Sequence, residues 1–403
     1  MAHEVMLPDN IVYGLGSFAE VGRLAKDLGT KAFLISDAVM EKIGHVDACR
    51  RYVTEAGVEV GGAYCQVNTE PTDRHVAEAL ALCRESESDL VVAVGGGSCI
   101  DAAKAVAVMM TNEGSLRDYA GTAKRFEHRP LPLIAVPTTA GTGSEVTKVT
   151  VIIDTERDIK MMISRPELLP KAAVVDAKLS LSCPKSVTAA SGIDALCHAL
   201  EAYLSKKAHP VTDVWALKAI GLLMEHLPTV YASAGQEEAQ AEVALGAMLA
   251  GAAFSNASVT LVHGMSRPIG ALFHVPHGIS NAMLLPAVLE FTLGHAEERL
   301  ARIGRIMRPE SAGAAQHVLA QTVLDEVKKL CAALDIPNLR RWGIDPEAFR
   351  RALPKMAADA IASGSPANHP RSASAEQIER LYLVCYDYEL DRTASQGDVS
   401  CER

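Results

Sequence analysis

The spacing of hydrophobic residues changes about halfway along the chain. In the first half, short apolar runs alternate with segments in which apolar residues recur every three or four positions. The short runs predict strands at 31–36, 58–64, 89–97, 132–139 and 172–177. The intervening segments at 18–29, 74–86 and 99–111 have the spacing of amphipathic helices. Strands that alternate with helices indicate a mainly parallel sheet with helices on both faces.

From about Ser186 onward, the helical spacing continues and the segments are rich in alanine and leucine. We find no convincing strand in this half of the sequence. The pattern therefore predicts a Rossmann-like α/β domain over residues 1–183, followed by an all-helical domain over residues 184–403.

The composition narrows the classes of protein that fit this pattern. The chain has 403 residues, 49% of them hydrophobic and 22% charged, which is typical of a globular protein of about two domains. A net charge of −10 argues against nucleic acid and anionic membranes as partners. Nine cysteines without a CxxC pair favour reduced thiols. With no signal-peptide pattern and no 18-residue apolar run, we expect a soluble, cytoplasmic protein.

A glycine-rich turn joins one expected strand to the helix that follows it. Its residues are Gly95, Gly96, Gly97 and Ser98. Glycines let the backbone approach a ligand closely, and the start of a helix offers free N–H groups to an anion. The turn therefore predicts a pyrophosphate site, although an ordinary strand–helix turn is the simpler alternative.

A second loop follows the expected strand at 132–139. It carries four hydroxyl groups among its glycines, on Thr138, Thr139, Thr142 and Ser144. Open α/β sheets bind ligands at the carboxyl ends of their strands. We expect these groups to hydrogen-bond the ribose or nicotinamide of a cofactor, the alternative being a solvated loop.

Asp37 stands at the end of the first expected strand. A carboxylate there can accept hydrogen bonds from ribose hydroxyls and repel a 2′-phosphate, which favours NAD over NADP. The alternative is an aspartate that only caps the next helix.

Asp194 and His198 are four positions apart in a segment with helical spacing, so their side chains share one face. His263 and His277 lie further along, each followed by glycine. One carboxylate and three imidazoles suit a divalent transition metal such as Fe(II) or Zn(II). The four residues are therefore candidate metal ligands.

These motifs together resemble the iron-containing, or group III, alcohol dehydrogenases. The similarity rests on GGGSCIDAAKA at 95–105, PTTAGTGSEVT at 137–147, ASGIDALCHALEAYLS at 190–205, PHG at 276–278 and NHPR at 368–371. The resemblance implies a dehydroquinate synthase-like architecture, iron(II) or zinc held by the four candidate ligands, and a homodimer or larger oligomer. It also adds Asp101 and Lys104 to the cofactor site and places Lys160 near the cofactor or substrate.

Arg267 departs from the family pattern. Many members carry at this position a histidine that is often given a proton-relay role, whereas a guanidinium stays protonated. We expect Arg267 to bind an anionic group on the substrate, and water, a ribose hydroxyl or His274 to carry the proton. The alternative is an arginine that faces solvent or pairs with a carboxylate.

The function expected from these features is a metal-dependent, NAD-linked alcohol dehydrogenase or aldehyde reductase acting on a small substrate. Two alternatives are a lyase similar to dehydroquinate synthase and a non-catalytic protein that binds NAD and a metal. The lyase would need several basic groups for a phosphate-bearing substrate, and few stand near the metal motifs.

Overall fold

The computed structural model describes residues 2–122, 124–157 and 159–390. The chain divides into two compact units. We call residues 1–202 and 208–258 the sheet unit, and residues 203–207 and 259–403 the helical unit.

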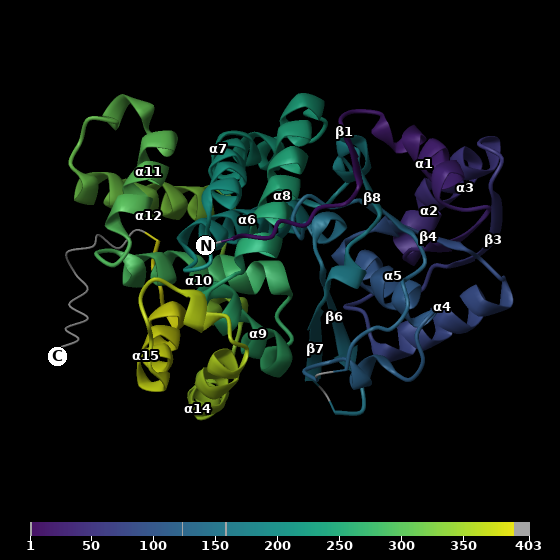
Figure 1. Ribbon diagram of the computed structural model, residues 1–403. Helices are drawn as coiled ribbons and strands as arrows, with labels where there is room; N and C mark the ends of the chain where they lie inside the picture. The colour runs from purple at the N-terminus through teal and green to yellow at the C-terminus, as the bar shows by residue number, and fades with distance from the viewer. Residues whose placement is uncertain (1, 123, 158, 391–403) are drawn as a thin grey trace. The chain divides into compact units, whose positions relative to one another are not determined.

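The sheet unit is built around six parallel strands (Figure 1). Their order across the sheet is β1 (Asn10–Tyr13), β8 (Ala172–Val175), β5 (Leu133–Pro137), β4 (Leu90–Gly95), β2 (Lys31–Ile35) and β3 (Glu59–Tyr64). Every residue of β4 and β5 is buried, as expected for strands covered on both faces. Together with the helices described below, this confirms the predicted fold class.

Alternate residues of the central strands face two separate layers of helices. Phe33 and Val91 pack with α4 (Asp73–Glu85) and α5 (Gly97–Met109) on one face. Leu34 and Val92 pack with α1 (Glu20–Leu28) and α3 (His45–Glu55) on the other. Successive side chains of a strand point to opposite faces, so these near-continuous apolar runs supply both halves of the core.

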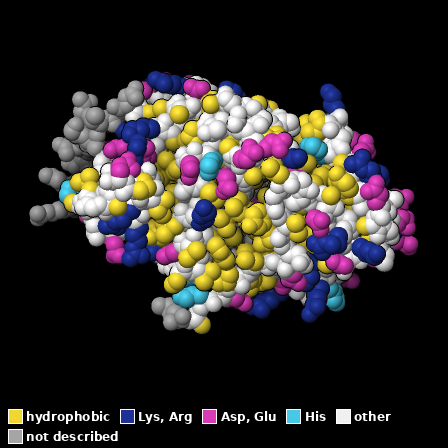
Figure 2. Space-filling model, turned by 90° about the horizontal axis from the view of Figure 1, so that it is seen from above, with side chains coloured by type: hydrophobic (Ala, Val, Ile, Leu, Met, Phe, Trp, Pro, Cys, Tyr) yellow, Lys and Arg dark blue, Asp and Glu magenta, His cyan; other side chains and the backbone are white. Residues whose placement is uncertain are grey.

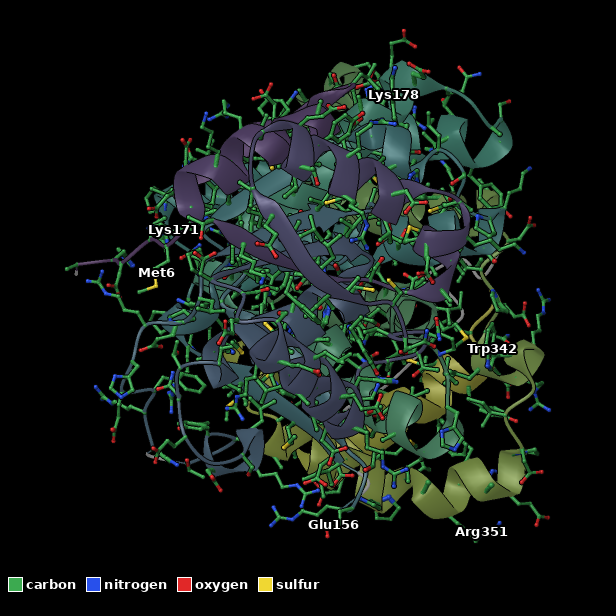
Figure 3. All side chains as sticks on the ribbon, turned by 90° about the vertical axis from the view of Figure 1, so that its right-hand side faces the viewer. Met6, Glu156, Lys171, Lys178, Trp342 and Arg351 are labelled. Atoms are coloured by element: carbon green, nitrogen blue, oxygen red, sulfur yellow. The ribbon has the colours of Figure 1, made fainter. Side chains whose placement is uncertain are left out.

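Strand β1 and an antiparallel hairpin were not predicted. The hairpin consists of β6 (Val149–Asp154) and β7 (Ile159–Ser164), and Glu156 projects from its turn (Figure 3). Arg117 bonds to Asp73 at 2.9 Å and to Asp154 at 2.8 Å, which ties the hairpin to α4. β1 is only four residues long, and its pairing with β8 joins residues that are 162 positions apart, such as Asn10 and Ala172. The hydrophobic spacing within so short a strand is too weak to predict it.

Among the described residues, every regular element after β8 is helical. These helices are α6 (Lys185–Leu204), α7 (Pro210–Ala232), α8 (Glu237–Ala257), α9 (Leu261–Phe273), α10 (His277–Thr292), α11 (Glu297–Met307), α12 (Gln316–Ala333), α13 (Leu339–Trp342), α14 (Pro346–Ala362) and α15 (Ala375–Tyr386), with short 3-10 turns between some of them. The sheet unit also contains α7, α8 and most of α6. The predicted boundary after residue 183 thus separates strands from helices, but it is not the boundary between the compact units.

The composition also bears on the cysteines, on membrane-spanning helices and on the charge of the surface. The eight cysteines in the described part of the chain are all free. No single helix within the described ranges is long and apolar enough to cross a membrane, and only α8 and α9 taken together pass such a test of length and composition. On the face drawn in Figure 2, acidic and basic side chains are interspersed.

Candidate cofactor and metal sites

The chain reverses its direction across the sheet between β2 and β4. From β2 it moves outward to β3, then returns to β4 on the other side of β2 and continues to β5 and β8. Because all these strands are parallel, their carboxyl ends lie at one edge of the sheet. Asp37 follows β2, and the glycine turn follows β4. Neighbouring strand ends at such a switch point form the usual ligand crevice of open α/β sheets.

The glycine turn is packed too tightly for other residues. A Cβ on Gly95 would lie 2.5 Å from Cys99 Sγ, and one on Gly97 would lie 2.8 Å from Thr142 Oγ1. Helix α5 begins at Gly97, and no side chain caps its first turn. The N–H groups of Cys99 and Ile100 donate to Gly96 O, so those of Gly97 and Ser98 are the ones that face an anion, which supports a pyrophosphate site at this turn and on Ser98.

The second predicted loop lies directly against this turn. The backbone N–H of Thr138 donates to Gly95 O at 3.0 Å, and a Cβ on Gly96 would lie 3.6 Å from Thr139. Thr138 is buried, whereas Thr139 and Thr142 are partly exposed. The structure therefore brings together the two loops that the sequence assigned separately to the cofactor.

Asp37 caps helix α2 (Ala38–Lys42), which is the alternative considered above. Its Oδ1 accepts hydrogen bonds from Val39 N at 2.9 Å and Met40 N at 3.0 Å. Its Oδ2 accepts from Cys99 Sγ at 3.5 Å, on the side of the glycine turn. One carboxylate oxygen thus holds the helix, while the other faces the candidate cofactor site.

Asp101, Lys104 and Ser144 bind one another in the interior of the sheet unit. The Lys104 ammonium donates to Ser144 Oγ at 2.8 Å, Thr147 Oγ1 at 3.0 Å and Val149 O at 2.6 Å. The Asp101 carboxylate accepts from Ser144 Oγ at 2.5 Å and Val151 N at 2.8 Å. An ammonium has three hydrogens, and all three are used here. In this arrangement Lys104 holds the loop after β5 against α5, and its predicted part in the cofactor site stays a prediction.

Lys160 lies on β7, where its Nζ pairs with Glu70 at 2.7 Å. The side chain is about 20% exposed. This ion pair with Glu70 orients the Lys160 side chain. That Lys160 contacts the cofactor or the substrate stays a prediction.

Sequence reasoning missed Glu145, which lies in the same loop and is only 3% exposed. Burial raises the pKa of its carboxyl to about 7, and the nearby Lys104 charge offsets part of that effect. Burial in turn lowers the pKa of Lys104 to about 8. A glutamate among glycines and threonines has no apolar spacing around it, so nothing in the sequence marked it as buried.

This buried carboxyl should make stability depend on pH. The pKa of Glu145 rises from 4.5 to about 7 on folding, so its contribution to stability is complete below about 4.5 and is lost as the pH rises through 7. We expect Glu145→Gln, which cannot ionise, to show a smaller fall in the free energy of unfolding across this range. Urea unfolding at several pH values would measure it. Parallel curves for the two proteins would contradict the assignment.

Asp194 and His198 lie one turn apart on α6 and are both buried, at 2% and 5% exposure. The His198 ring stacks on Phe254 of α8, with 4.1 Å between the centroids. Asp194 and His198 therefore share one face of α6, as predicted, and both belong to the sheet unit.

His263 on α9 and His277 at the start of α10 converge within the helical unit. Their ring centroids are 5.2 Å apart, and both Nε2 atoms are 3.2 Å from Nδ2 of Asn281. The other nitrogen of His277, Nδ1, is 3.5 Å from the Ser266 hydroxyl. Imidazoles that bind metal commonly use one nitrogen for the ion and the other for such a neighbour. This pair therefore fits a transition-metal site.

Arg267 lies on α9, four residues after His263, and Pro268 does not interrupt the helix. It is partly buried, and its Nη1 donates to Ser365 Oγ at 3.1 Å. His274 follows the helix in the left-handed region, at φ 53°, and is exposed. The structure thus orients Arg267 through Ser365 and leaves His274 accessible to solvent.

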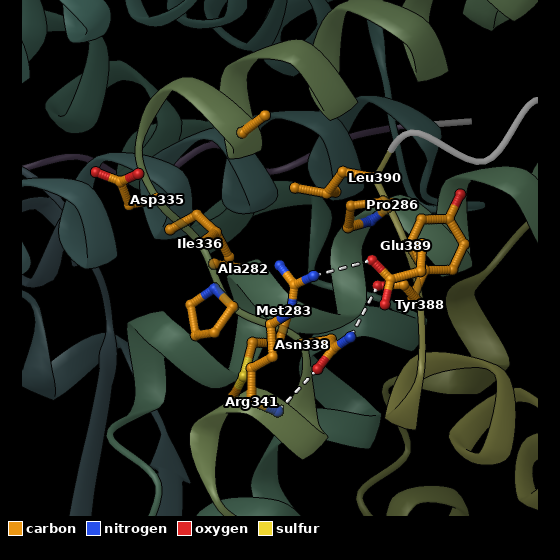
Figure 4. A pocket seen from close by; sticks show the side chains of 12 residues that line it. Ala282, Met283, Pro286, Asp335, Ile336, Asn338, Arg341, Tyr388, Glu389 and Leu390 are labelled. Atoms are coloured by element: carbon orange, nitrogen blue, oxygen red, sulfur yellow. Dashed lines mark hydrogen bonds and ion pairs between the residues drawn. The ribbon is translucent and has the colours of Figure 1, made fainter.

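The helical unit also contains a pocket of about 310 Å³ along α10 (Figure 4). Its lining includes Met283, Asn338, Arg341, Tyr388 and Glu389. Arg341 bonds to Glu389 at 3.3 Å, and Asn338 Nδ2 donates to Tyr388 O at 3.2 Å. None of the residues predicted from the sequence lines this pocket, so we do not assign it to the substrate.

Comparison with known proteins covers nearly the whole chain. A family model described as iron-containing alcohol dehydrogenase matches residues 8–177, and one for the C-terminal part of that family matches residues 188–386. The 1,3-propanediol dehydrogenase of Klebsiella pneumoniae is 36% identical over 387 residues, or 95% of this chain and 98% of that protein. A crystal structure of a 1,3-propanediol oxidoreductase matches with a TM-score of 0.92 and 34% identity, covering 96% of this chain and all of the other. The sulfoacetaldehyde reductase of Bifidobacterium kashiwanohense, solved with NAD+, matches with a TM-score of 0.87, 25% identity and the same coverage.

Proposed function

Because the chain belongs to the iron-containing alcohol dehydrogenase family, we propose that it transfers hydride between NAD and a small alcohol or aldehyde that bears an anionic group. Family membership makes the chain an oxidoreductase acting on CH–OH groups and confirms the predicted enzyme class. The relatives reported above are a dehydrogenase, an oxidoreductase and a reductase, which gives no support to the lyase or to a non-catalytic binding protein. The observation that carries the substrate class is Arg267, one helical turn beyond His263.

We propose that Asp194, His198, His263 and His277 hold one iron(II) or zinc ion. Asp194, His263 and His277 each offer one atom that can bind a metal, and His198 adds a third imidazole. Such an ion acts as a Lewis acid toward the alcohol or carbonyl oxygen. The four residues therefore decide whether the protein can stabilise the negative charge of an alkoxide.

The remaining candidate residues bind and orient the cofactor. The free N–H groups at the start of α5 hold the pyrophosphate, and the loop with Thr138, Thr139 and Thr142 orients the nicotinamide half. Lys104 and Asp101 keep that loop in place from the interior. Because Arg267 cannot release a proton, the proton passes to water, a ribose hydroxyl or the exposed His274. The active protein is a homodimer or larger oligomer.

Asp37 should make the protein prefer NAD to NADP. Its Oδ2 faces the glycine turn, so it would repel a 2′-phosphate on the adenosine ribose. We expect Asp37→Asn, which keeps a capping oxygen for α2, to narrow the preference by roughly tenfold, or about 1.4 kcal/mol. The ratio of kcat/KM for the two cofactors measures it. A wild-type protein that uses both equally well would contradict the assignment.

An anionic substrate follows from the chemistry of Arg267. A guanidinium forms charge-assisted and often bidentate hydrogen bonds with carboxylate, phosphonate or sulfonate groups. Neutral alcohols offer the guanidinium no such anionic group. The similar sulfoacetaldehyde reductase supports this class, because its named substrate carries a sulfonate.

We expect Arg267 to favour an ω-hydroxy acid over the neutral diol of the same length. Arg267→His should reduce the ratio of kcat/KM for the two substrates by about 10–100-fold, since a charge-assisted hydrogen bond contributes about 1.5–3 kcal/mol. Arg299→His provides a control, because Arg299 is bonded to Tyr203 O elsewhere in the helical unit. If the wild-type protein shows no preference for the acid, Arg267 does not bind the substrate.

A further inference from the structure

Asn281 contacts both converging histidines and has no role in the function proposed above. It is fully buried on α10, one turn after His277. Its Nδ2 lies 3.2 Å from Nε2 of His263 and 3.2 Å from Nε2 of His277. A carboxamide nitrogen carries two hydrogens, so it can donate one to each imidazole.

This arrangement selects one tautomer of each ring. A neutral imidazole that accepts a hydrogen bond at Nε2 carries its own hydrogen at Nδ1. In His277 that hydrogen points toward the Ser266 hydroxyl, 3.5 Å from Nδ1. The Ser266 hydroxyl is itself hydrogen-bonded to Ser280, whose hydroxyl also lies 2.9 Å from the His277 carbonyl oxygen. Metal binding through Nε2 needs the same tautomer.

We propose that Asn281 is a positioning residue that keeps His263 and His277 in their metal-binding tautomer and orientation before the ion binds. The inference rests on the proposed metal site. The two amide hydrogens point to the Nε2 atoms of both rings, which favours Nε2 as the acceptor and Nδ1 as the donor in each. A divalent ion would replace the amide hydrogens at the same Nε2 lone pairs, so the rings would not need to rearrange.

The tautomers can be observed directly in metal-free protein. We would label histidine with ¹⁵N, remove metal with a chelator and record ring-nitrogen NMR spectra at about pH 8, where imidazole is mostly neutral. His263→Gln and His277→Gln assign the signals. The wild-type protein should carry hydrogen on Nδ1 of both rings. Asn281→Asp keeps the side-chain shape but replaces the donor with an acceptor, so it should move the hydrogen to Nε2 of at least one ring.

Metal affinity provides the second measurement. Asn281→Leu removes both donors and should weaken Zn²⁺ binding by about 10–100-fold, the usual effect of losing a group that orients metal ligands. Asn338→Leu is the matched control: it removes another buried amide of the helical unit, which caps α13 and does not contact either histidine. It should lower stability while leaving the tautomers and the zinc affinity unchanged.

Three results would overturn the inference. Wild-type rings with hydrogen on Nε2 would contradict it directly. So would unchanged tautomers in Asn281→Asp, or a loss of zinc affinity in Asn338→Leu as large as that in Asn281→Leu. A wild-type protein with the expected tautomers that binds no divalent ion would instead contradict the proposed function, and Asn281 would then orient the rings for another purpose.

Discussion

Replacing His277 with alanine is expected to lower kcat/KM for alcohol oxidation by about 10³-fold, since a Lewis acid contributes several kcal/mol and each 1.4 kcal/mol is a factor of ten. The imidazole stands at the first residue of α10, where its Nε2 converges with that of His263 on Asn281. Its loss removes a ligand from the proposed metal site. The imidazole is only partly buried, so the fold should survive.

Metal analysis and circular dichroism separate the two effects. We expect the variant to lose bound iron or zinc while its far-ultraviolet spectrum stays that of the wild type. His295→Ala is the control, because His295 is exposed and bonds only weakly, to Leu293 O at 3.4 Å. Full metal occupancy together with full activity in His277→Ala would refute the ligand assignment.

Replacing Lys104 with methionine should destabilise the protein by about 3–5 kcal/mol, the usual cost of leaving one charge of a buried pair without its partner. Lys104 is 1% exposed and lies 3.7 Å from Asp101, and it also holds Ser144, Thr147 and the carbonyl of Val149. Without the ammonium, the loop after β5 loses its attachment to α5. The KM for NAD should therefore rise as well, because that loop faces the glycine turn.

Two further variants test the cause of this loss. Adding Asp101→Asn to Lys104→Met removes the unpaired carboxylate and should recover about 1–3 kcal/mol. Lys171, which is labelled in Figure 3, forms a surface ion pair with Asp9, so Lys171→Met should change stability by less than about 1 kcal/mol. Urea unfolding measures all of them. A Lys104→Met protein as stable as Lys171→Met would show that the buried network does not hold the loop.

The order of elements could be read from the sequence because periodicity is a local property. The buried runs of β4 and β5, and the amphipathic segments of α4 and α5, carry their pattern within a few residues. The glycine turn could be predicted for the same reason, because three adjacent glycines at the end of an apolar strand form a pattern within one segment. The metal motif could be partly read, because a spacing of four places Asp194 and His198 on one helix face.

Other features depend on contacts between distant segments. The pairing of β1 with β8 joins residues 162 positions apart, and no local pattern predicts it. The side chains of Asp101 and Lys104 bind Ser144 and Thr147, which lie 40 or more residues further along the chain. The role proposed for Asn281 depends on the packing of α9 and α10, which brings both His263 and His277 to its amide.

The sequence by itself determined the fold class, the glycine turn, the candidate metal ligands and the family. Each of these depends on residue type and spacing within one segment. Only the tertiary structure decided that Lys104 faces inward, that Asp37 caps a helix while facing the turn, and that Glu145 is buried. The physical reason is that the partners and the solvent exposure of a polar side chain depend on which distant segments pack against it.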